Sequence, residues 1–197
     1  KFHNFHNLFG GNRMFTYTID EELSIKLVEL KDAERIFKLT DHSRLYLREW
    51  LPWLDYTKTV GDTFEYIKAA IKGYSENASL TTTILYKGEI AGIAGFNQFN
   101  WPNKNTSIGY WLGEGFQGKG IMTRTAAALT KYALTDLNLN RVEIRAAVGN
   151  QKSRSIPERL GFTYEGVARQ SEWLYDHYVD HAVYSMLAED IKQVQRL

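Results

Sequence analysis

A short glycine-rich segment has the composition of an anion-binding loop. It runs Gln117-Gly118-Lys119-Gly120 and stands between a predicted strand that ends at Leu112 and a predicted helix that begins at Ile121. Glycines let such a loop turn tightly, and the first N–H groups of a helix attract negative charge. The segment therefore predicts a pyrophosphate site, and a tight connection without a ligand is the alternative. It matches neither GxGxxG nor GxxxxGK[ST], which disfavours a dinucleotide or a nucleoside triphosphate.

Two histidines near the end of the chain raise the question of a metal. His177 and His181 stand four residues apart, beside Asp176 and Asp180. That spacing brings two ligands to one site in a helix, whereas this stretch is typical of a hairpin turn that enters a strand. The HExxH pattern is absent, so we expect no metal. The GxSxG pattern of α/β-hydrolases is absent as well.

Hydrophobic periodicity predicts the elements that must position these residues. Strands are predicted at residues 23–27, 80–86, 90–96, 106–112, 142–148, 163–168 and 179–187, and helices at 32–40, 59–74, 121–132 and 151–160. Alanines and glycines at 91–95 indicate that something packs very close to that strand. Gly161 suits a left-handed helix cap. The pattern predicts one α/β domain with a mixed sheet.

The glycine-rich loop and a second segment together resemble the GCN5-related N-acetyltransferase (GNAT) superfamily. Residues 117–122 resemble its motif A, Q/R-x-x-G-x-G/A, with Met122 in place of the last glycine or alanine. Residues 150–162, from Asn150 to a closing Leu-Gly-Phe, resemble motif B. The agreement in element order extends from residue 23 to residue 187. It implies a GNAT fold of the α/β (α+β) class, with a mixed sheet of six to seven strands, splayed at the cofactor site and flanked by about four helices.

Within the superfamily, the chain resembles the RimJ/RimL-type branch of ribosomal-protein N-terminal acetyltransferases. The segments that carry this likeness are LREWLPW at 47–53, GKGIMT at 118–123 and the end of the last predicted strand at 180–187. The resemblance implies acetyl transfer from acetyl-CoA to a primary amine, with the N-terminal α-amine of a protein, such as a ribosomal one, as the acceptor.

The same resemblance implies where acetyl-CoA binds. The thioester oxygen is expected on backbone N–H groups at the end of a strand, around Leu112 and Gly113. Met122 should contribute a backbone contact that does not depend on its side chain. Lys119, Lys152 and Arg154 are candidates for the 3′-phosphate. The full set of expected cofactor residues is Leu112, Gln117, Gly118, Lys119, Gly120, Ile121, Met122, Asn150, Ser153 and Arg154.

Two residues are expected to move protons. An α-amine has a pKa of about 8, so one carboxylate suffices to deprotonate it. Many GNAT enzymes protonate the thiolate with a motif B tyrosine, but Pro157 stands in that position. The RimL-like branch implies Ser153 as the acid and Glu172 as the base. A helix-capping serine and a solvated hairpin carboxylate are the respective alternatives.

Tryptophans are the expected walls of the acceptor site. Trp50 and Trp53 would line it together with Glu172, because the loop after the first helical region overlies that site in the family. Core or dimer-interface roles are the alternatives. Together with Trp101 and Trp173 they also predict a homodimer or a higher homo-oligomer.

Composition narrows the classes of partner. The 197 residues carry a formal net charge of +1, which favours neither nucleic acid nor an anionic membrane as partner. The chain has no cysteine, so an acyl group cannot rest on a thiol and the acceptor should attack the thioester directly. No apolar run approaches the roughly 20 residues that span a bilayer, and we expect a cytoplasmic enzyme. Residues 1–13 are typical of an expression leader or tag remnant, and 14–197 of one acyltransferase domain.

The sequence leaves two other functions open. One keeps the fold and cofactor but takes a small amine, such as a polyamine or an aminoglycoside. The other is a non-catalytic acyl-CoA-binding module, which would be favoured if Glu172 and Ser153 pointed away from the thioester.

Overall fold

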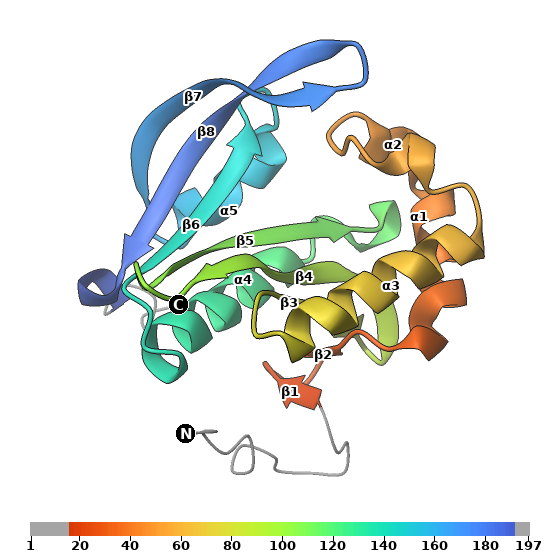
Figure 1. The fold of residues 1–197 in the computed structure, drawn as a ribbon, viewed down its shortest axis with the longest axis horizontal. Helices are drawn as coiled ribbons and strands as arrows, with labels where there is room; N and C mark the ends of the chain where they lie inside the picture. The colour runs from red at the N-terminus through yellow and green to blue at the C-terminus, as the bar shows by residue number, and fades with distance from the viewer. Residues whose placement is uncertain (1–15, 192–197) are drawn as a thin grey trace.

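The computed structural model describes residues 16–191 (Figure 1). The expected leader at 1–13 and the expected domain start at Met14 lie outside the described residues, so both stay predictions. Among residues 16–191, no helix has the length and apolar character needed to cross a membrane.

An eight-stranded sheet forms the centre of the molecule (Figure 1). Its order is β1-β2-β3-β4-β5-β6-β8-β7, and β5 and β6 are the parallel pair in an otherwise antiparallel sheet. The strands are β1 (Thr16–Thr18), β2 (Leu23–Leu27), β3 (Leu80–Tyr86), β4 (Glu89–Asn100), β5 (Asn105–Leu112), β6 (Arg141–Ala147), β7 (Thr163–Leu174) and β8 (His177–Leu187). The predicted mixed α/β class is confirmed. One strand more than the expected six to seven is present, because the three residues of β1 pair with β2 and are too few to show a period.

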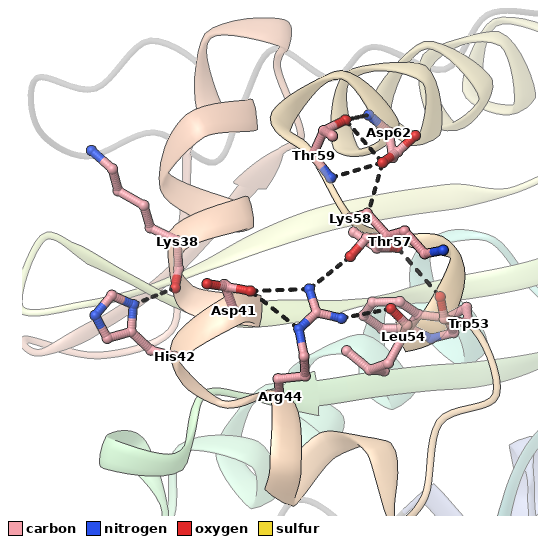
Figure 2. A network of polar contacts seen from close by, with 10 residues as sticks. All are labelled: Lys38, Asp41, His42, Arg44, Trp53, Leu54, Thr57, Lys58, Thr59 and Asp62. Carbon is pink, nitrogen blue, oxygen red and sulfur yellow. Dashed lines mark hydrogen bonds and ion pairs between the residues drawn. The ribbon is translucent and has the colours of Figure 1, made fainter.

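Five α-helices flank the sheet within residues 16–191, where about four were expected. They are α1 (Ala33–His42), α2 (Arg44–Arg48), α3 (Val60–Ser75), α4 (Ile121–Lys131) and α5 (Gln151–Arg159). The additional one, α2, has only five residues, which are too few to show a helical period in the sequence. The predicted start of α3 is confirmed by a reciprocal cap: the Asp62 N–H donates to Thr59 Oγ1 at 3.2 Å, and the Thr59 N–H donates to Asp62 Oδ2 at 2.8 Å (Figure 2).

The helices cover the two faces of the sheet separately. Alternate residues of β3 mark the two faces: Ile84 belongs to the core under α4 and α5, and its neighbour Leu85 to the core under α1 and α3. The close approach predicted for residues 91–95 is between strands, since a Cβ on Gly95 would lie 2.0 Å from the carbonyl oxygen of Leu80.

The parallel pair at the centre of the sheet parts halfway along. β5 and β6 are in register only from Asn105 to Ser107 and from Arg141 to Glu143, although β5 continues to Leu112 and β6 to Ala147. The splayed strands expected from the resemblance are therefore present. The gap leaves backbone groups of β5 without a partner strand on the β6 side.

Candidate active site

A cavity of about 920 Å³ lies where β5 and β6 diverge, on the face of the sheet that α1 and α3 cover. Its walls come from strands β3 to β8, from helices α1, α3 and α5, and from the loop after α2. The expected proton-moving and acceptor residues meet there with several aromatic side chains: Trp50, Trp53, Tyr66, Tyr110, Trp111, Asn150, Ser153, Glu172 and His181. Because Glu172 and Ser153 share one cavity, the arrangement favours a catalytic role over a module that only binds.

A bulge in β7 brings Glu172 into this cavity. Between the partners of His181 and Val179 on β8, the β7 chain advances four residues where β8 advances two. Gln170 adopts a left-handed conformation (φ 48°), and its N–H donates to Asp180 Oδ1 at 2.7 Å. The two additional residues place Glu172, rather than Gln170, opposite Val179.

The Glu172 carboxylate faces an imidazole. Glu172 Oε2 lies 3.3 Å from His181 Nε2, and the side chains are 32% and 15% exposed. His177 is separate from this pair: it is the exposed first residue of β8, next to the hairpin turn, with Nδ1 2.6 Å from Asp176 Oδ1. No group of three or more His, Asp or Glu residues that could hold a metal occurs within the described range 16–191. The sequence raised His181 only as a metal ligand and missed its contact with Glu172.

Ser153 presents its hydroxyl to a buried phenol. The helix cap is Asn150, whose Oδ1 accepts the Ser153 N–H at 3.0 Å, so the alternative of Ser153 as the cap is wrong. The Ser153 hydroxyl donates to Tyr110 Oη at 3.4 Å, and Tyr110 Oη donates to the Ser153 carbonyl at 3.3 Å. Burial raises the pKa of Tyr110 far above its ordinary value, which keeps this phenol protonated.

Pro157 explains why that phenol is needed. A proline inside a helix has no N–H for the carbonyl four residues before it, and in α5 that carbonyl belongs to Ser153. Tyr110, which comes from β5, supplies the missing donor. The sequence showed Pro157 only as a residue that cannot act as an acid, because the compensating tyrosine is 47 residues away.

The tip of the β7–β8 hairpin is tied to the loop after α2 (Figure 1). Tyr175 Oη donates to the Leu51 carbonyl at 2.5 Å, and the Arg48 guanidinium lies 4.0 Å from the centroid of the Tyr175 ring. Arg48 also pairs with both carboxylate oxygens of Asp55 at 2.8 Å each. The hairpin that carries Glu172 and the loop that carries the tryptophans thus support each other.

Arg44 fixes the other end of the same loop, as Figure 2 shows. Its Nη1 donates to the Leu54 carbonyl and its Nη2 to the Thr57 carbonyl, both at 2.7 Å. The loop therefore holds Trp53 at the cavity wall, with its ring centroid 6.0 Å from that of Trp111.

The glycine-rich loop lies outside the lining of the cavity and leads into α4. Gly118 and Gly120 have φ of 73° and 68°, a region that glycine adopts without strain. The side chains of Ile121 and Met122 are buried, while their N–H groups, in the first turn of α4, have no protein acceptor among residues 16–191. A ligand here would meet backbone donors, so the methionine in the last motif A position is no obstacle.

Two groups that were expected to contact the cofactor form hydrogen bonds within the protein instead. The Gly113 N–H donates to the Ala91 carbonyl at 2.9 Å and is not free for a thioester oxygen, whereas the alternation of the ladder turns the Leu112 N–H toward the gap. Arg154 Nε donates to Tyr184 Oη at 2.9 Å and Nη1 to the Val148 carbonyl at 3.1 Å.

Lys119 and Lys152 lie by the glycine-rich loop. Lys119 Nζ donates to the Gly115 carbonyl at 3.1 Å. Lys152 Nζ donates to Gln117 Oε1 at 3.0 Å and so links α5 to the loop. Both ammonium groups are therefore close to the backbone donors, whereas the Arg154 guanidinium is held against β8.

Comparison with known proteins shows the family to which this chain belongs. The model of the acetyltransferase (GNAT) domain matches residues 22–163. The chain is 36% identical over 179 residues to YdaF of Bacillus subtilis (strain 168), provisionally named a ribosomal N-acetyltransferase; the match covers 90% of this chain and 97% of YdaF. The chain belongs to the GNAT family. It is an acetyl-CoA-dependent N-acetyltransferase.

Two solved structures are similar to this GNAT enzyme over nearly their whole length. RimL, a ribosomal L7/L12 alpha-N-protein acetyltransferase in complex with coenzyme A, has a TM-score of 0.85 at 27% identity and covers 89% of this chain and 99% of RimL. The microcin C7 self-immunity acetyltransferase MccE, in complex with acetyl-CoA and AMP, has a TM-score of 0.82 at 30% identity, covering 86% and 94%. The predicted RimJ/RimL-type resemblance is confirmed.

Proposed function

We propose that this GNAT enzyme acetylates the N-terminal α-amine of a protein, with ribosomal proteins as the acceptor class. The observation that carries the proposal is the cavity of about 920 Å³ around Glu172, which has room for several residues of a peptide. Its similarity to RimL, an alpha-N-protein acetyltransferase, supports the same acceptor. Ribosomal acceptors would place the reaction in the cytoplasm.

The charges in the cavity favour a peptide over a polyamine. Among the lining residues, the carboxylates of Asp62 and Glu172 are offset by the Arg145 guanidinium, which leaves one net negative charge. A polycation gains little from a single negative charge in surroundings that also hold an arginine. A peptide has one ammonium group at its end and dipolar amides behind it, which suits a lining of both signs.

Acetyl-CoA would approach from the α4 side of the sheet. Its pyrophosphate fits the N–H groups that follow Gly118 and Gly120, with Lys119 and Lys152 close by. Its pantetheine arm fits the gap between β5 and β6, next to Asn150, and its thioester oxygen fits the Leu112 N–H. These are the residues to which we assign the cosubstrate.

The same placement of acetyl-CoA indicates which groups take up and give protons. Glu172 takes a proton from the acceptor ammonium, and the neutral nitrogen then attacks the thioester carbonyl carbon. The carbon–sulfur bond breaks as the nitrogen gives its second proton to the regenerated Glu172 carboxylate, and the Ser153 hydroxyl donates a proton to the departing thiolate and recovers one from solvent. The absence of cysteine agrees with direct transfer, since no thiol is present to carry the acetyl group.

The acceptor is tested by release of free CoA thiol from acetyl-CoA. Short peptides with a free N-terminus are compared with the same peptides blocked by a formyl group, with spermidine and with an aminoglycoside. We expect release only with free peptides, and mass spectrometry should place the acetyl group on the α-amine. Release with spermidine or the aminoglycoside alone would move the acceptor to small amines.

A further inference from the structure

The cavity contains one more group that can take up a proton, besides Glu172. Two carboxylates line it, and one of them, Asp62, is occupied at the start of α3, where it accepts the N–H groups of Lys58 and Thr59 at 2.9 and 2.8 Å. The remaining proton acceptor is the imidazole of His181, 3.3 Å from Glu172.

The chemistry of amide formation calls for two acceptors. An acceptor ammonium carries three N–H protons and the amide product carries one, so two protons leave the nitrogen. One carboxylate can hold only one of them at a time. A second base beside the first lets the carboxylate act twice in a turnover.

We propose that His181 is the proton relay of this active site and acts through Glu172. The proposal rests on the role of Glu172 assigned above. Glu172 takes the first proton from the ammonium and passes it to His181 Nε2, which restores the carboxylate. Glu172 then takes the second proton as the N–C bond forms and the C–S bond breaks. The thiolate receives a proton from Ser153, which recovers one from solvent. Over one turnover, one acceptor ammonium and one acetyl-CoA give one amide, one free CoA thiol and one proton released to solvent.

The surroundings of His181 fit a relay. It pairs in the sheet with Ala147 of β6 and Ala168 of β7, so only methyl groups flank the ring in the ladder. Its Nδ1 has no hydrogen-bond partner within residues 16–191. The ring is 15% exposed, which leaves a path by which a proton taken on one nitrogen can leave from the other.

The test is chemical rescue of a histidine variant by free imidazole. A histidine that only filled space would not be replaced in function by a base in solution. His181→Ala is compared with His177→Ala, which removes a histidine from the same strand outside the cavity. The acceptor is whichever amine the wild-type enzyme acetylates fastest, so failure with peptides would count against the proposed acceptor and not against the relay. We expect His181→Ala to lose roughly ten- to a hundredfold in kcat at unchanged KM for acetyl-CoA. Free imidazole should restore part of this loss and should not stimulate His177→Ala.

A second variant separates a relay from a structural role. His181→Gln keeps a group that can donate to Glu172 but cannot take up a proton, and we expect it to stay slow. A wild-type rate in His181→Gln would overturn the relay. A loss in His181→Ala that imidazole does not restore would overturn it too. If His181→Ala unfolds at the assay temperature, the His181→Gln rate alone decides.

Discussion

Ser153 and its neighbours show how a single proline changes the proton-donating site. Pro157 stands where the GNAT resemblance places a tyrosine, and it also removes the N–H that would bond the Ser153 carbonyl. The Tyr110 hydroxyl donates a hydrogen bond to that carbonyl and accepts one from the serine hydroxyl. A tyrosine is thus still present beside the serine that we propose as the acid, but it comes from β5 and bonds the Ser153 carbonyl.

Replacement of Ser153 tests its role as the acid. We expect Ser153→Ala to lower kcat roughly a hundredfold while KM for acetyl-CoA changes little, since Asn150 caps the helix. Ser155→Ala is the matched control, because that hydroxyl donates to the Lys152 carbonyl on the same helix. Steady-state kinetics measure both. Equal rates in the two variants would contradict the role of Ser153.

Removal of the Tyr110 hydroxyl tests its positioning role. Tyr110→Phe leaves the Ser153 carbonyl without a donor, and we expect a loss of about 1–3 kcal/mol in the free energy of unfolding. The rate should fall less than in Ser153→Ala, because the serine hydroxyl is still present. Urea denaturation and steady-state kinetics measure the two effects. Wild-type stability would show that the 3.3 Å contact contributes nothing.

The sequence could propose roles for Glu172 and Ser153 because their spacing matches a known branch. It could not show the contacts that His181 and Tyr110 make with them. Each makes its contact from another strand, across a register that depends on a bulge or on where two strands part. A histidine within a strand and a tyrosine in an apolar stretch carry no local signal of such contacts.

At the scale of elements, the bulge in β7 decides which side chain enters the cavity. The predicted strand ended at Ala168, but β7 continues to Leu174 across the bulge and turns at Tyr175. Polar residues in the bulge interrupt the alternation on which strand prediction rests. Glu172, the carboxylate that we propose as the base, lies in the part of the strand that periodicity left out.

Asp180 stabilises this bulge, and substitution of Asp180 tests how much the bulge contributes to the rate. We expect Asp180→Ala to lower kcat, by less than Glu172→Gln does, because the bulge loses its bond to the Gln170 N–H. Asp180→Asn keeps a side-chain oxygen that can accept this bond and should restore most of the rate. The pair is compared in steady-state assays with acetyl-CoA at saturation. An unchanged rate in Asp180→Ala would show that the bulge holds without this carboxylate.

A second element-scale prediction concerns the acid stability of β6, β7 and β8. Hydrogen bonds from Arg141 and then Ser185 lower the pKa of Glu165 from its ordinary value of 4.5 to about 2. A carboxyl whose pKa is lowered by folding adds stability above pH 4.5, and this is lost as pH falls toward 2. We expect Glu165→Gln to be less stable than wild type at pH 7, with the difference shrinking below pH 4.5.

Thermal melts at pH 7 and pH 3 measure this difference. Glu89→Gln is the control, because that exposed carboxylate has no ion pair in the described part of the chain. Glu165 is itself partly exposed, so the effect should be modest. A difference between wild type and Glu165→Gln that is constant with pH would contradict the link to this carboxyl.

In the molecule as a whole, the proposed cosubstrate site and the acceptor cavity meet where β5 and β6 part. The glycine-rich loop and α4 lie on one side, and the acceptor cavity opens on the face under α1 and α3. The sequence predicted the order of elements and the two motifs, because both are local. The closure of the cavity is not local, since the contact of Tyr175 with Leu51 spans 124 residues.

Self-association stays a prediction at this scale. Of the tryptophans on which it rests, Trp173 is 52% exposed and packs edge-on against the exposed Tyr178 ring at 4.8 Å, while Trp50 and Trp53 line the cavity. Trp101 is 37% exposed as well, so Trp101 and Trp173 are the tryptophans through which a second copy would be recognised. Sedimentation of the wild-type chain measures the state directly.

We infer that Glu172 deprotonates a peptide α-amine in this cavity, and a single assay can decide whether it does. CoA release from acetyl-CoA with a free-N-terminus peptide is compared in wild type, Glu172→Gln and Glu89→Gln. We expect a loss of roughly a hundredfold or more in kcat for Glu172→Gln only, with acetyl-CoA binding by calorimetry unchanged in all three. A Glu172→Gln enzyme that acetylates the peptide at the wild-type rate would contradict it.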